Sequence, residues 1–324
     1  MILINYHNSE PTVYPVIDWL NHLGFEYYLI NQMSSAFEFK NVSISNNGMV
    51  LNLSEEIEGK NTTFWNRRSI PLHYQFDLNS IDKTKINNFF KKEFKYINEA
   101  VNLYFEDHNC LNKYNDNDTN KIYNLFVAQS YKLKIPDTLV TNKKKCLEAF
   151  ANKHSKIITK AIDSTNYLFD IKHQTGLSTL IDNEVLNDLS NVFFPSLFQE
   201  YIEKKIELRS FFIGDKFFSI AIFSQNDTST SIDLRNYNYS RPNRVVPFQL
   251  PKAVESKLKR TMKKLRLNTG CIDLILNKNN EYVFLEVNPV GMLGHLSWPL
   301  NINVEKEIAL YLSNPVEYAK TKKE

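Results

Sequence analysis

The sequence predicts a mixed α/β and α+β protein, and three observations support this fold class. Strand, helix and strand signals follow one another over residues 2–30, which is the beginning of a βαβ unit and of a parallel sheet. From about residue 194, alternating apolar and polar residues joined by tight turns indicate an antiparallel sheet. A polar, acidic stretch at residues 115–119 separates the two regions, and 324 residues leave room for two or three domains.

The composition is that of a globular protein. Hydrophobic residues make up 43% and charged residues 23%, and a net charge of +3 is too small to indicate a nucleic-acid partner. No apolar run approaches the ~20 residues of a membrane helix, and the first residues lack the features of a signal peptide. The three cysteines are far apart and odd in number, which excludes a disulfide framework. We therefore expect a cytoplasmic protein with no nucleic-acid and no membrane partner.

Residues 1 to about 105 are expected to form a small α/β domain. Gly24 follows an amphipathic helix at the position where glycine commonly ends one. A later, longer helix carries an apolar stripe on one face and lysine and asparagine on the other. In order, the predicted elements are a strand at 2–6, a helix at 12–23, strands at 25–30, 50–53 and around Phe64, and a helix at 81–105.

Arg67 and Arg68 stand side by side after Trp65 in this first domain. Adjacent arginines can hold a phosphate or a carboxylate through forked hydrogen bonds. A solvated arginine next to an arginine in a surface ion pair explains the same residues equally well, so both interpretations stay open.

The middle of the chain is predicted to alternate short helices and strands, one of which ends in Lys160. The first helix ends before Pro136, because a residue that precedes proline avoids helical angles. The irregular stretch 161–178 is long for a loop without a function, which makes it a candidate lid over a ligand. The predicted helices are 120–133 and 142–152, and the predicted strands are 137–140 and 157–160.

The last third is predicted to form an antiparallel sheet with helices. In one strand, Glu207 and Arg209 face one way and Leu208 and Ser210 the other, because side chains alternate along a strand. The predicted strands are 198–202, 205–212, 216–223, 231–235, 270–276 and 281–288; one helix opens at Pro251, another spans 304–312, and 313–324 is expected to be a charged tail.

The last predicted hairpin sets three oxygen-bearing side chains in an apolar background. Glu286 and Asn288 are two residues apart and share a face of their strand, and Asp273 on the partner strand can face them. Carboxylate and amide oxygens suit Mg²⁺, which binds proteins through one or two carboxylates together with phosphate oxygens. The alternative, a hairpin whose polar residues face water, does not explain why all three would gather on one side.

Charged residues of both signs fall on neighbouring predicted strands, where unpaired buried charges are costly. They are Lys160, Glu200, Glu207, Arg209, Asp273 and Glu286. Cations of this kind neutralise phosphates and carboxylates hold Mg²⁺, which is the equipment for phosphoryl transfer. Neither common phosphate-loop signature, GxxxxGK[ST] or GxGxxG, occurs in the chain.

In this order and spacing, the sequence resembles the ATP-grasp ligases over residues 115–312. The resemblance implies an ATP-grasp fold with an N-terminal domain at 1–113, a central subdomain at 114–196 and a C-terminal subdomain at 197–324. It also implies ATP and Mg²⁺ as cofactors. The matching positions are Lys121 and Lys160 for phosphates, Glu200, Tyr201 and Ile202 for the hinge that reads adenine, Glu207 for ribose, and Asp273, Glu286 and Asn288 for the metal. Lys134 stands near the position where the family has a glycine.

Segments such as Glu207-Leu208-Arg209 and Glu286-Val287-Asn288-Pro289 are similar to the graspetide synthetases, the microviridin-type and grasp-with-spasm peptide maturases. Such enzymes use ATP to activate Asp or Glu side chains of a ribosomal precursor peptide that has a leader and a core containing Thr, Glu and Asp. Thr or Ser hydroxyls then close ω-ester rings, and in some members Lys closes ω-amide rings. The resemblance implies the same partner and reaction here.

Many ATP-grasp ligases carry arginine where this chain has Cys271, so another cation must neutralise the reacting group. Arg209 and Arg235 are the candidates. Asp233 is a candidate to orient the attacking hydroxyl or to take its proton, and an ion pair with Arg235 is an equal alternative.

Two other classes of function stay open. One is a different ATP-grasp ligase that adds glutamate to a protein tail or joins small molecules through an amide. The other is a non-catalytic module that binds nucleotide and peptide. Assembly into a homodimer is also considered, and nothing in the sequence decides it.

Overall fold

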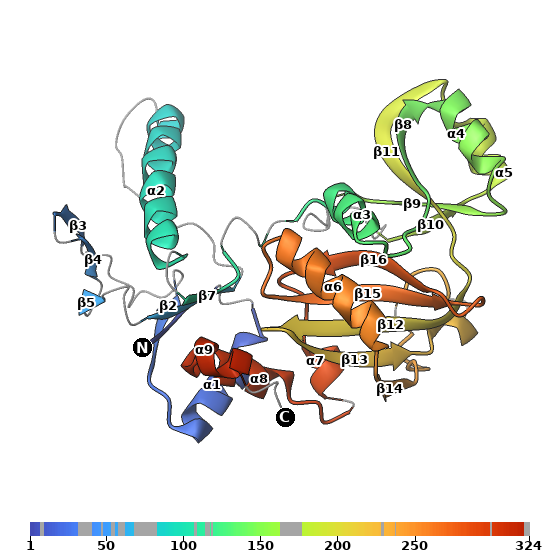
Figure 1. Ribbon diagram of the computed structural model, residues 1–324. Helices are drawn as coiled ribbons and strands as arrows, with labels where there is room; N and C mark the ends of the chain where they lie inside the picture. The colour runs from blue at the N-terminus through green and yellow to red at the C-terminus, as the bar shows by residue number, and fades with distance from the viewer. Residues whose placement is uncertain are drawn as a thin grey trace.

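The computed structural model describes residues 1–6, 10–31, 41–46, 48–52, 56–57, 62–67, 83–106, 109–113, 117, 119–162, 177–227, 230–236, 238–298 and 300–320. In this part of the chain the strands form four sheets, with helices packed against them (Figure 1). Arg68, residues 163–176 of the candidate lid and most of the acidic stretch at 115–119 lie outside the described residues.

A parallel sheet forms the N-terminal region. Its strands follow the order β2 (Tyr27–Asn31), β1 (Ile2–Tyr6), β6 (Thr63–Arg67) and β7 (Asn109–Leu111). Helix α1 (Val13–Leu23) joins β1 to β2, which pair in parallel, so the predicted βαβ unit is confirmed. Gly24 ends α1 with a φ of 73°, a left-handed angle that glycine adopts without a Cβ clash.

Helix α2 (Lys83–Glu106) and a small antiparallel sheet stand away from the large sheet, at the left of Figure 1. The end of α2 is anchored, because Phe105 stacks on Phe64 of β6 at 5.3 Å between ring centroids. Although α2 has 24 residues, no helix of the described residues is both long and apolar enough to cross a membrane. The small sheet consists of β3 (Asn41–Ser45), β4 (Gly48–Asn52) and β5 (Glu56–Ile57).

The central region contains an antiparallel sheet with two short helices. Its strands follow the order β10 (Thr179–Ile181), β9 (Ile157–Lys160), β11 (Val192–Glu200) and β8 (Thr138–Lys143); the helices are α4 (Lys144–Ala151) and α5 (Asn183–Asp188). A small core around Leu147, Ile157 and Phe198 holds helix and sheet together. The predicted strand at 198–202 runs too far, because β11 ends at Glu200 and residues 201–203 connect to the next sheet.

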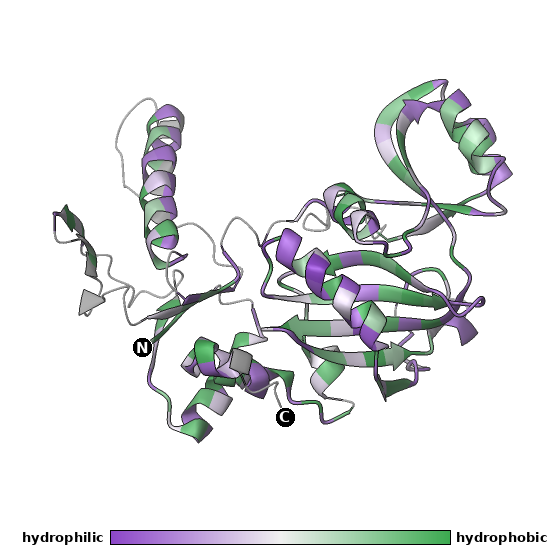
Figure 2. Cartoon of the chain, in the orientation of Figure 1, coloured by the Kyte–Doolittle hydropathy of each residue, from purple (hydrophilic) through white to green (hydrophobic). Residues whose placement is uncertain are grey.

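The large antiparallel sheet has β12 at its centre. Its strands follow the order β14 (Val245–Phe248), β13 (Lys216–Ile222), β12 (Lys204–Ile213), β15 (Thr269–Asn277) and β16 (Tyr282–Asn288). One face packs against α3 (Lys121–Ser130) and α6 (Lys252–Lys264) through a core that includes Leu208 and Leu274. The outer side of α6 is hydrophilic, which fits its amphipathic sequence (Figure 2).

The opposite face of the large sheet is apolar only in part. Phe211 and Cys271 on this face join the N-terminal strands and α8 (Val304–Ser313) in one core. Because side chains alternate, Glu207, Arg209 and Asp273 lie on the same face as this core. The polar residues of the predicted site are therefore next to the junction with the N-terminal region.

One predicted strand is wrong. Residues 231–235 form turns, because the Asp233 carboxylate accepts a hydrogen bond from the N–H of Arg235 at 3.0 Å. A side chain that bonds the backbone two residues ahead turns the chain instead of extending it.

The predicted tail is also corrected, because it contains helix α9 (Pro315–Lys320). Asn314 caps this helix by accepting a hydrogen bond from the N–H of Glu317 at 3.1 Å. Tyr318 packs edge-on against Tyr311 of α8, with ring centroids 5.4 Å apart. The cap and the aromatic contact thus hold α9 against α8.

Candidate active site

The hairpin of β15 and β16 brings the candidate metal ligands onto one face of the large sheet. Asp273 pairs directly with Glu286, and Cys271 pairs with Asn288. Residues that pair directly across antiparallel strands point to the same side, so both carboxylates and the amide share a face. The predicted facing arrangement is confirmed, while the binding of a metal stays a prediction.

The donor set fits a hard cation. Burial raises the pKa of Asp273 to about 6 against the pull of Arg209, and the charge of Glu286 adds to the rise. Two carboxylates that repel each other in a partly buried place gain from a cation held between them. Within the described residues no group of three His, Cys, Asp or Glu side chains can hold a metal, so the other ligands would be Asn288, phosphate oxygens and water.

Two lysines from outside the large sheet approach Glu286. Lys121 is the first residue of α3, and its Nζ lies 3.5 Å from Glu286 Oε2 and 3.3 Å from the carbonyl oxygen of Ala161. Lys160 ends β9; burial lowers its pKa, Glu286 opposes the shift, and Lys121 adds to it. The structure therefore places both predicted phosphate-binding lysines close to a candidate metal ligand.

The predicted adenine-reading residues lie where the chain passes from β11 to β12. Glu200 Oε1 accepts a hydrogen bond from the N–H of Asp137 at 3.0 Å. The N–H of Tyr201 donates to the carbonyl oxygen of Lys156 at 3.0 Å. These bonds tie the connection to the central sheet, and Ile202 follows on the way to the large sheet. This is the place of a hinge, and its contact with adenine stays a prediction.

Glu207, the predicted ribose ligand, is buried and holds two partners. Its Oε2 accepts hydrogen bonds from Lys204 Nζ at 2.7 Å and from Ser224 Oγ at 2.9 Å. The pairing of β12 with β15 shifts register between Lys204 and Ile206, and such a bulge lets Lys204 reach the face of Glu207. Sequence reasoning missed Lys204, because residues three apart in a regular strand point to opposite faces.

Arg209 lies on β12 directly opposite Asp273 of β15. Its Nη1 is 3.3 Å from Asp273 Oδ1, and its Nη2 donates to the carbonyl oxygen of Met292 at 3.4 Å. Burial opposes the charge, yet Asp273 and its neighbours raise the pKa of the guanidinium, which stays protonated. A fixed cation therefore stands beside the candidate metal site, and its action on a reacting group stays a prediction.

Asp233 forms an ion pair with Arg235, which was the alternative to a role of Asp233 as a base. Arg235 Nη2 and Nε lie 2.6 Å and 2.9 Å from the two carboxylate oxygens, and the N–H of Ser178 donates to Asp233 Oδ2 at 2.8 Å. Burial would raise the pKa of Asp233, but the hydrogen bonds from Arg235 and Ser178 lower it to about 2. A carboxylate held so firmly is a weak base.

Of the two adjacent arginines, only Arg67 lies within the described residues. It pairs with Glu10 at 3.5 Å, and the pair is buried, not exposed at the surface as one of the two interpretations expected. Its Nη2 also donates to the carbonyl oxygen of Gly291 at 2.8 Å. No local sequence signal pointed to this contact.

The chain matches no protein-family model and no curated protein. It is similar to several solved structures over nearly its whole length. The macrocyclase MdnC from Microcystis aeruginosa MRC, bound with the precursor peptide MdnA, is 24% identical, with 97% of this chain and 99% of that chain covered and a TM-score of 0.75.

Two further structures give the same result. A RiPP-associated ATP-grasp ligase from Chryseobacterium gregarium, in complex with ADP and a leader and core peptide, is 22% identical, covers 97% of this chain and 96% of its own, and has a TM-score of 0.82. The ATP-grasp ligase PsnB, complexed with minimal precursor, Mg and ADP, is 17% identical, covers 96% of each chain and has a TM-score of 0.75. The chain has the ATP-grasp fold. The predicted fold is thereby confirmed.

In an ATP-grasp fold the nucleotide lies between two α+β subdomains, as the sequence resemblance implied. Lys160 comes from β9 of the central sheet, whereas Lys121 comes from α3, which packs against the large sheet. Glu207, Asp273 and Glu286 come from the large sheet. The predicted site residues are thus divided between the two parts of the fold, while the predicted domain boundaries stay predictions.

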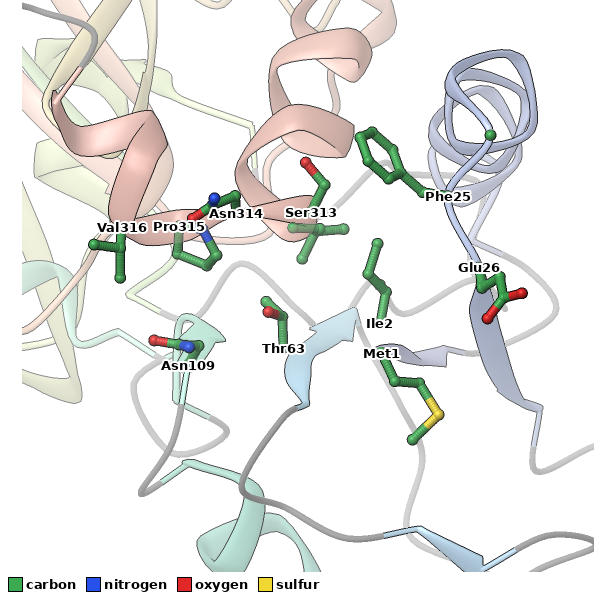
Figure 3. A pocket seen from close by; sticks show the side chains of 12 residues that line it. Met1, Ile2, Phe25, Glu26, Thr63, Asn109, Ser313, Asn314, Pro315 and Val316 are labelled. Carbon is green, nitrogen blue, oxygen red and sulfur yellow. The ribbon is translucent and has the colours of Figure 1, made fainter.

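A cavity of about 430 Å³ lies elsewhere, at the amino ends of the parallel strands (Figure 3). Met1, Thr63, Asn109 and Pro315 are among the residues that line it. No predicted site residue lines this cavity. The candidate active site is therefore assigned from the charged residues around Asp273 and Glu286, and not from a cavity.

Proposed function

We propose that this chain is an ATP-dependent ligase that closes rings within a ribosomally made precursor peptide. It activates Asp or Glu side chains as acyl phosphates, and Thr or Ser then closes ω-ester rings, or Lys closes ω-amide rings. The observation that carries the proposal is the Asp273–Glu286 pair, with Lys121 on one side and Arg209 on the other. The structures of similar fold that hold precursor peptides, ADP and Mg support the same reaction class.

We assign the nucleotide to the side of the Asp273–Glu286 pair on which Lys121 and Lys160 lie, here called the lysine side. Lys121 and Lys160 bind its phosphates, the backbone at Ile202 contacts adenine, and Glu207 accepts hydrogen bonds from the ribose hydroxyls. Lys204 and Ser224 hold only Oε2 of Glu207, and their contact fixes the carboxylate for that task. Asp273, Glu286 and Asn288 hold Mg²⁺, which when bound neutralises charge on the phosphate oxygens.

The chemistry takes two steps. A carboxylate oxygen of the substrate attacks the γ-phosphorus, the bond to the ADP oxygen breaks, and an acyl phosphate forms. The hydroxyl or amine of the peptide then attacks the acyl carbon, loses its proton, and releases inorganic phosphate. Arg209 lies next to Asp273 and neutralises charge on the carboxylate and then on the developing oxyanion.

Arg235 is assigned to the same anionic substrate group, and Asp233 holds Arg235 in place. The paired contacts of 2.6 Å and 2.9 Å orient the guanidinium, as a carboxylate does when it grips an arginine fork. With a pKa of about 2, Asp233 is a poor acceptor for the proton of an alcohol. The proton therefore passes to another group or to phosphate.

The test is an incubation with ATP, Mg²⁺ and a peptide that contains Thr and Glu or Asp. Mass spectrometry should show the loss of one water for each ring, with ADP formed in equal amount. Release of ADP with free amino acids alone would support the small-molecule ligase instead. Retention of full activity in the double variant Glu286→Gln, Asn288→Ala would contradict catalysis at this metal site. A homodimer and a cytoplasmic location remain predictions.

A further inference from the structure

Arg67 reaches from the N-terminal sheet to the segment that follows the candidate metal strand. It ends β6, and only 4% of its surface is exposed. Its Nη2 donates to the carbonyl oxygen of Gly291 at 2.8 Å, a contact between residues 224 positions apart. Because a buried charge is costly without partners, this contact is a fixed part of the junction.

The same guanidinium is also held from its own region. Its Nε donates to Thr12 Oγ1 at 3.1 Å, and its Nη2 lies 3.5 Å from Glu10 Oε1. The hydroxyl of Thr12 donates in turn to Glu10. Donors of Arg67 are thus engaged by protein groups on two sides, which is the pattern of a residue that positions structure and does not itself bind a substrate anion.

The segment held by Arg67 packs directly on Arg209 and Cys271. The carbonyl oxygen of Met292 accepts a hydrogen bond from Arg209 Nη2 at 3.4 Å and lies 3.8 Å from Cys271 Sγ. A Cβ added at Gly291 would lie 2.6 Å from the Cβ of Cys271 and 3.1 Å from Arg209 Nη2. Two successive carbonyl groups therefore tie two arginines from different sheets to one short segment.

We propose that Arg67 is a positioning residue for the ligase reaction: it holds segment 291–292 so that Arg209 stays beside Asp273. The inference rests on the proposed function, which assigns Arg209 to the charge on the substrate carboxylate. It gives the N-terminal region a part in the chemistry although none of the assigned nucleotide ligands comes from it. Because Arg67 acts through Arg209, its loss slows the reaction and leaves nucleotide binding unchanged.

The kinetic test compares Arg67→Met and Arg67→Lys with a matched control, Lys216→Met. Lys216 is a cation near this junction that is less deeply buried than Arg67; it lies 3.4 Å from Glu307 and 3.9 Å from the ring centroid of Tyr318. Arg67→Met should lower kcat about 100-fold, the loss expected when a catalytic group moves by about 1 Å. Arg67→Lys should recover part of this loss, and Lys216→Met should keep kcat within about twofold of wild type.

The affinity for ADP with Mg²⁺ separates positioning from a general loosening of the fold. It should change by less than about twofold in Arg67→Met, since no nucleotide ligand is touched. An Arg67→Met enzyme whose kcat stays near wild type would overturn the proposal. So would a parallel loss of kcat and of ADP affinity.

A second measurement needs no activity. Cys271 is fully buried beneath this segment, whereas Cys146 is exposed and serves as an internal reference. Arg67→Met should speed alkylation of Cys271 by iodoacetamide at least about tenfold, because the segment opens more often, while Cys146 reacts as before. Lys216→Met should leave both rates unchanged. An unchanged Cys271 rate in Arg67→Met overturns the proposal.

The two measurements also distinguish this inference from the proposed function. If the wild type closes no ring in any peptide but the alkylation result holds, the positioning contact stands and the ring-closing function fails. If Arg67→Met does not fold, Arg67→Lys and Thr12→Val take its place, since Thr12→Val removes the acceptor of Arg67 Nε, together with the hydroxyl's own bond to Glu10, and keeps the guanidinium. A wild-type alkylation rate and a wild-type kcat in both of these would overturn the inference.

Discussion

The lysine side and the arginine side of the Asp273–Glu286 pair are built differently. Lys121 contacts Glu286 and one carbonyl oxygen, and burial lowers the pKa of Lys160, which makes no ion pair with the described residues. On the other side, Arg209 has both a carboxylate and a backbone carbonyl oxygen as partners. The difference lies in Lys160, because Lys121 and Arg209 each have a carboxylate and a carbonyl oxygen as partners.

The difference follows from the chemistry of the two side chains. Lysine is a compact charge on a flexible stem, so it can follow a phosphate as the ligand arrives and leaves. Arginine is a planar fork that keeps a set direction when two or more donors are engaged. We infer that affinity for the nucleotide resides mainly with the lysines and the rate of acyl transfer with the arginines.

Removing the charge between the two sides should have the largest effect. Glu286→Gln keeps the shape of the side chain but loses a proposed metal ligand and the partner of Lys121, so ADP formation should fall about 1,000-fold. The matched control on the same hairpin is Glu281→Gln, because Glu281 is paired, within the described part of the chain, with exposed Lys134 and with Asn277. A coupled assay of ADP release measures both. If the rate of ADP formation fell equally in Glu286→Gln and Glu281→Gln, Glu286 would have no specific role in the reaction.

A change on the arginine side should affect the rate alone. Arg209→Lys keeps the charge but replaces the planar guanidinium, which contacts both Asp273 and the carbonyl oxygen of Met292, with a single ammonium group. We therefore expect kcat to fall about 100-fold. The Kd for ADP with Mg²⁺, measured by calorimetry, should stay within about twofold. If the Kd rises as much as kcat falls, the two sides are not separate.

A change on the lysine side should act on affinity. Lys160→Met removes the charged donor that we propose for phosphate. Such a hydrogen bond is worth about 1.5 to 3 kcal/mol, so the Kd for ADP should rise about tenfold or more. Lys153→Met is the control, since Lys153 is exposed in the same region. If Lys160→Met had a normal Kd and a reduced kcat, Lys160 would act on the rate, as we infer for the arginines.

The smallest effect is expected at Asp233, and its pH dependence decides its role. Its pKa lies at about 2, below the usual value, so the carboxylate is ionised at every pH above its unfolded value and loses its charge only as pH falls toward 2. Asp233→Asn should lower kcat about tenfold, and this factor should be the same at every pH from 6 to 9. A general base would instead remove one limb of the pH–rate profile.

The site was predictable wherever the pattern is local. Strand alternation put Glu286 and Asn288 on one face, and the observed pairing of Asp273 with Glu286 agrees with it. The βαβ beginning was readable for the same reason, since a helix between two strands needs only short-range periodicity and a terminating Gly24. The order of the charged residues along the chain supplied the likeness to the ATP-grasp fold.

Other features were out of reach. Lys204 joins Glu207 only because a bulge changes the face of the strand, and no residue type in the segment signals that bulge. Asp233 turns the chain through its own side chain, so an apparent strand at 231–235 became a turn. The burial of Arg67 depends on a partner 224 positions away.

The sequence by itself determined the fold class, the hairpin with its three oxygen donors, and the set of charged residues. Those features depend on residue type and on spacings of a few positions, which backbone geometry converts directly into faces and turns. Only the tertiary structure decided which charges meet: Lys121 with Glu286, Arg209 with Asp273, and Arg67 with Gly291. Such pairs are set by how whole sheets pack, because packing brings together residues that no local pattern connects.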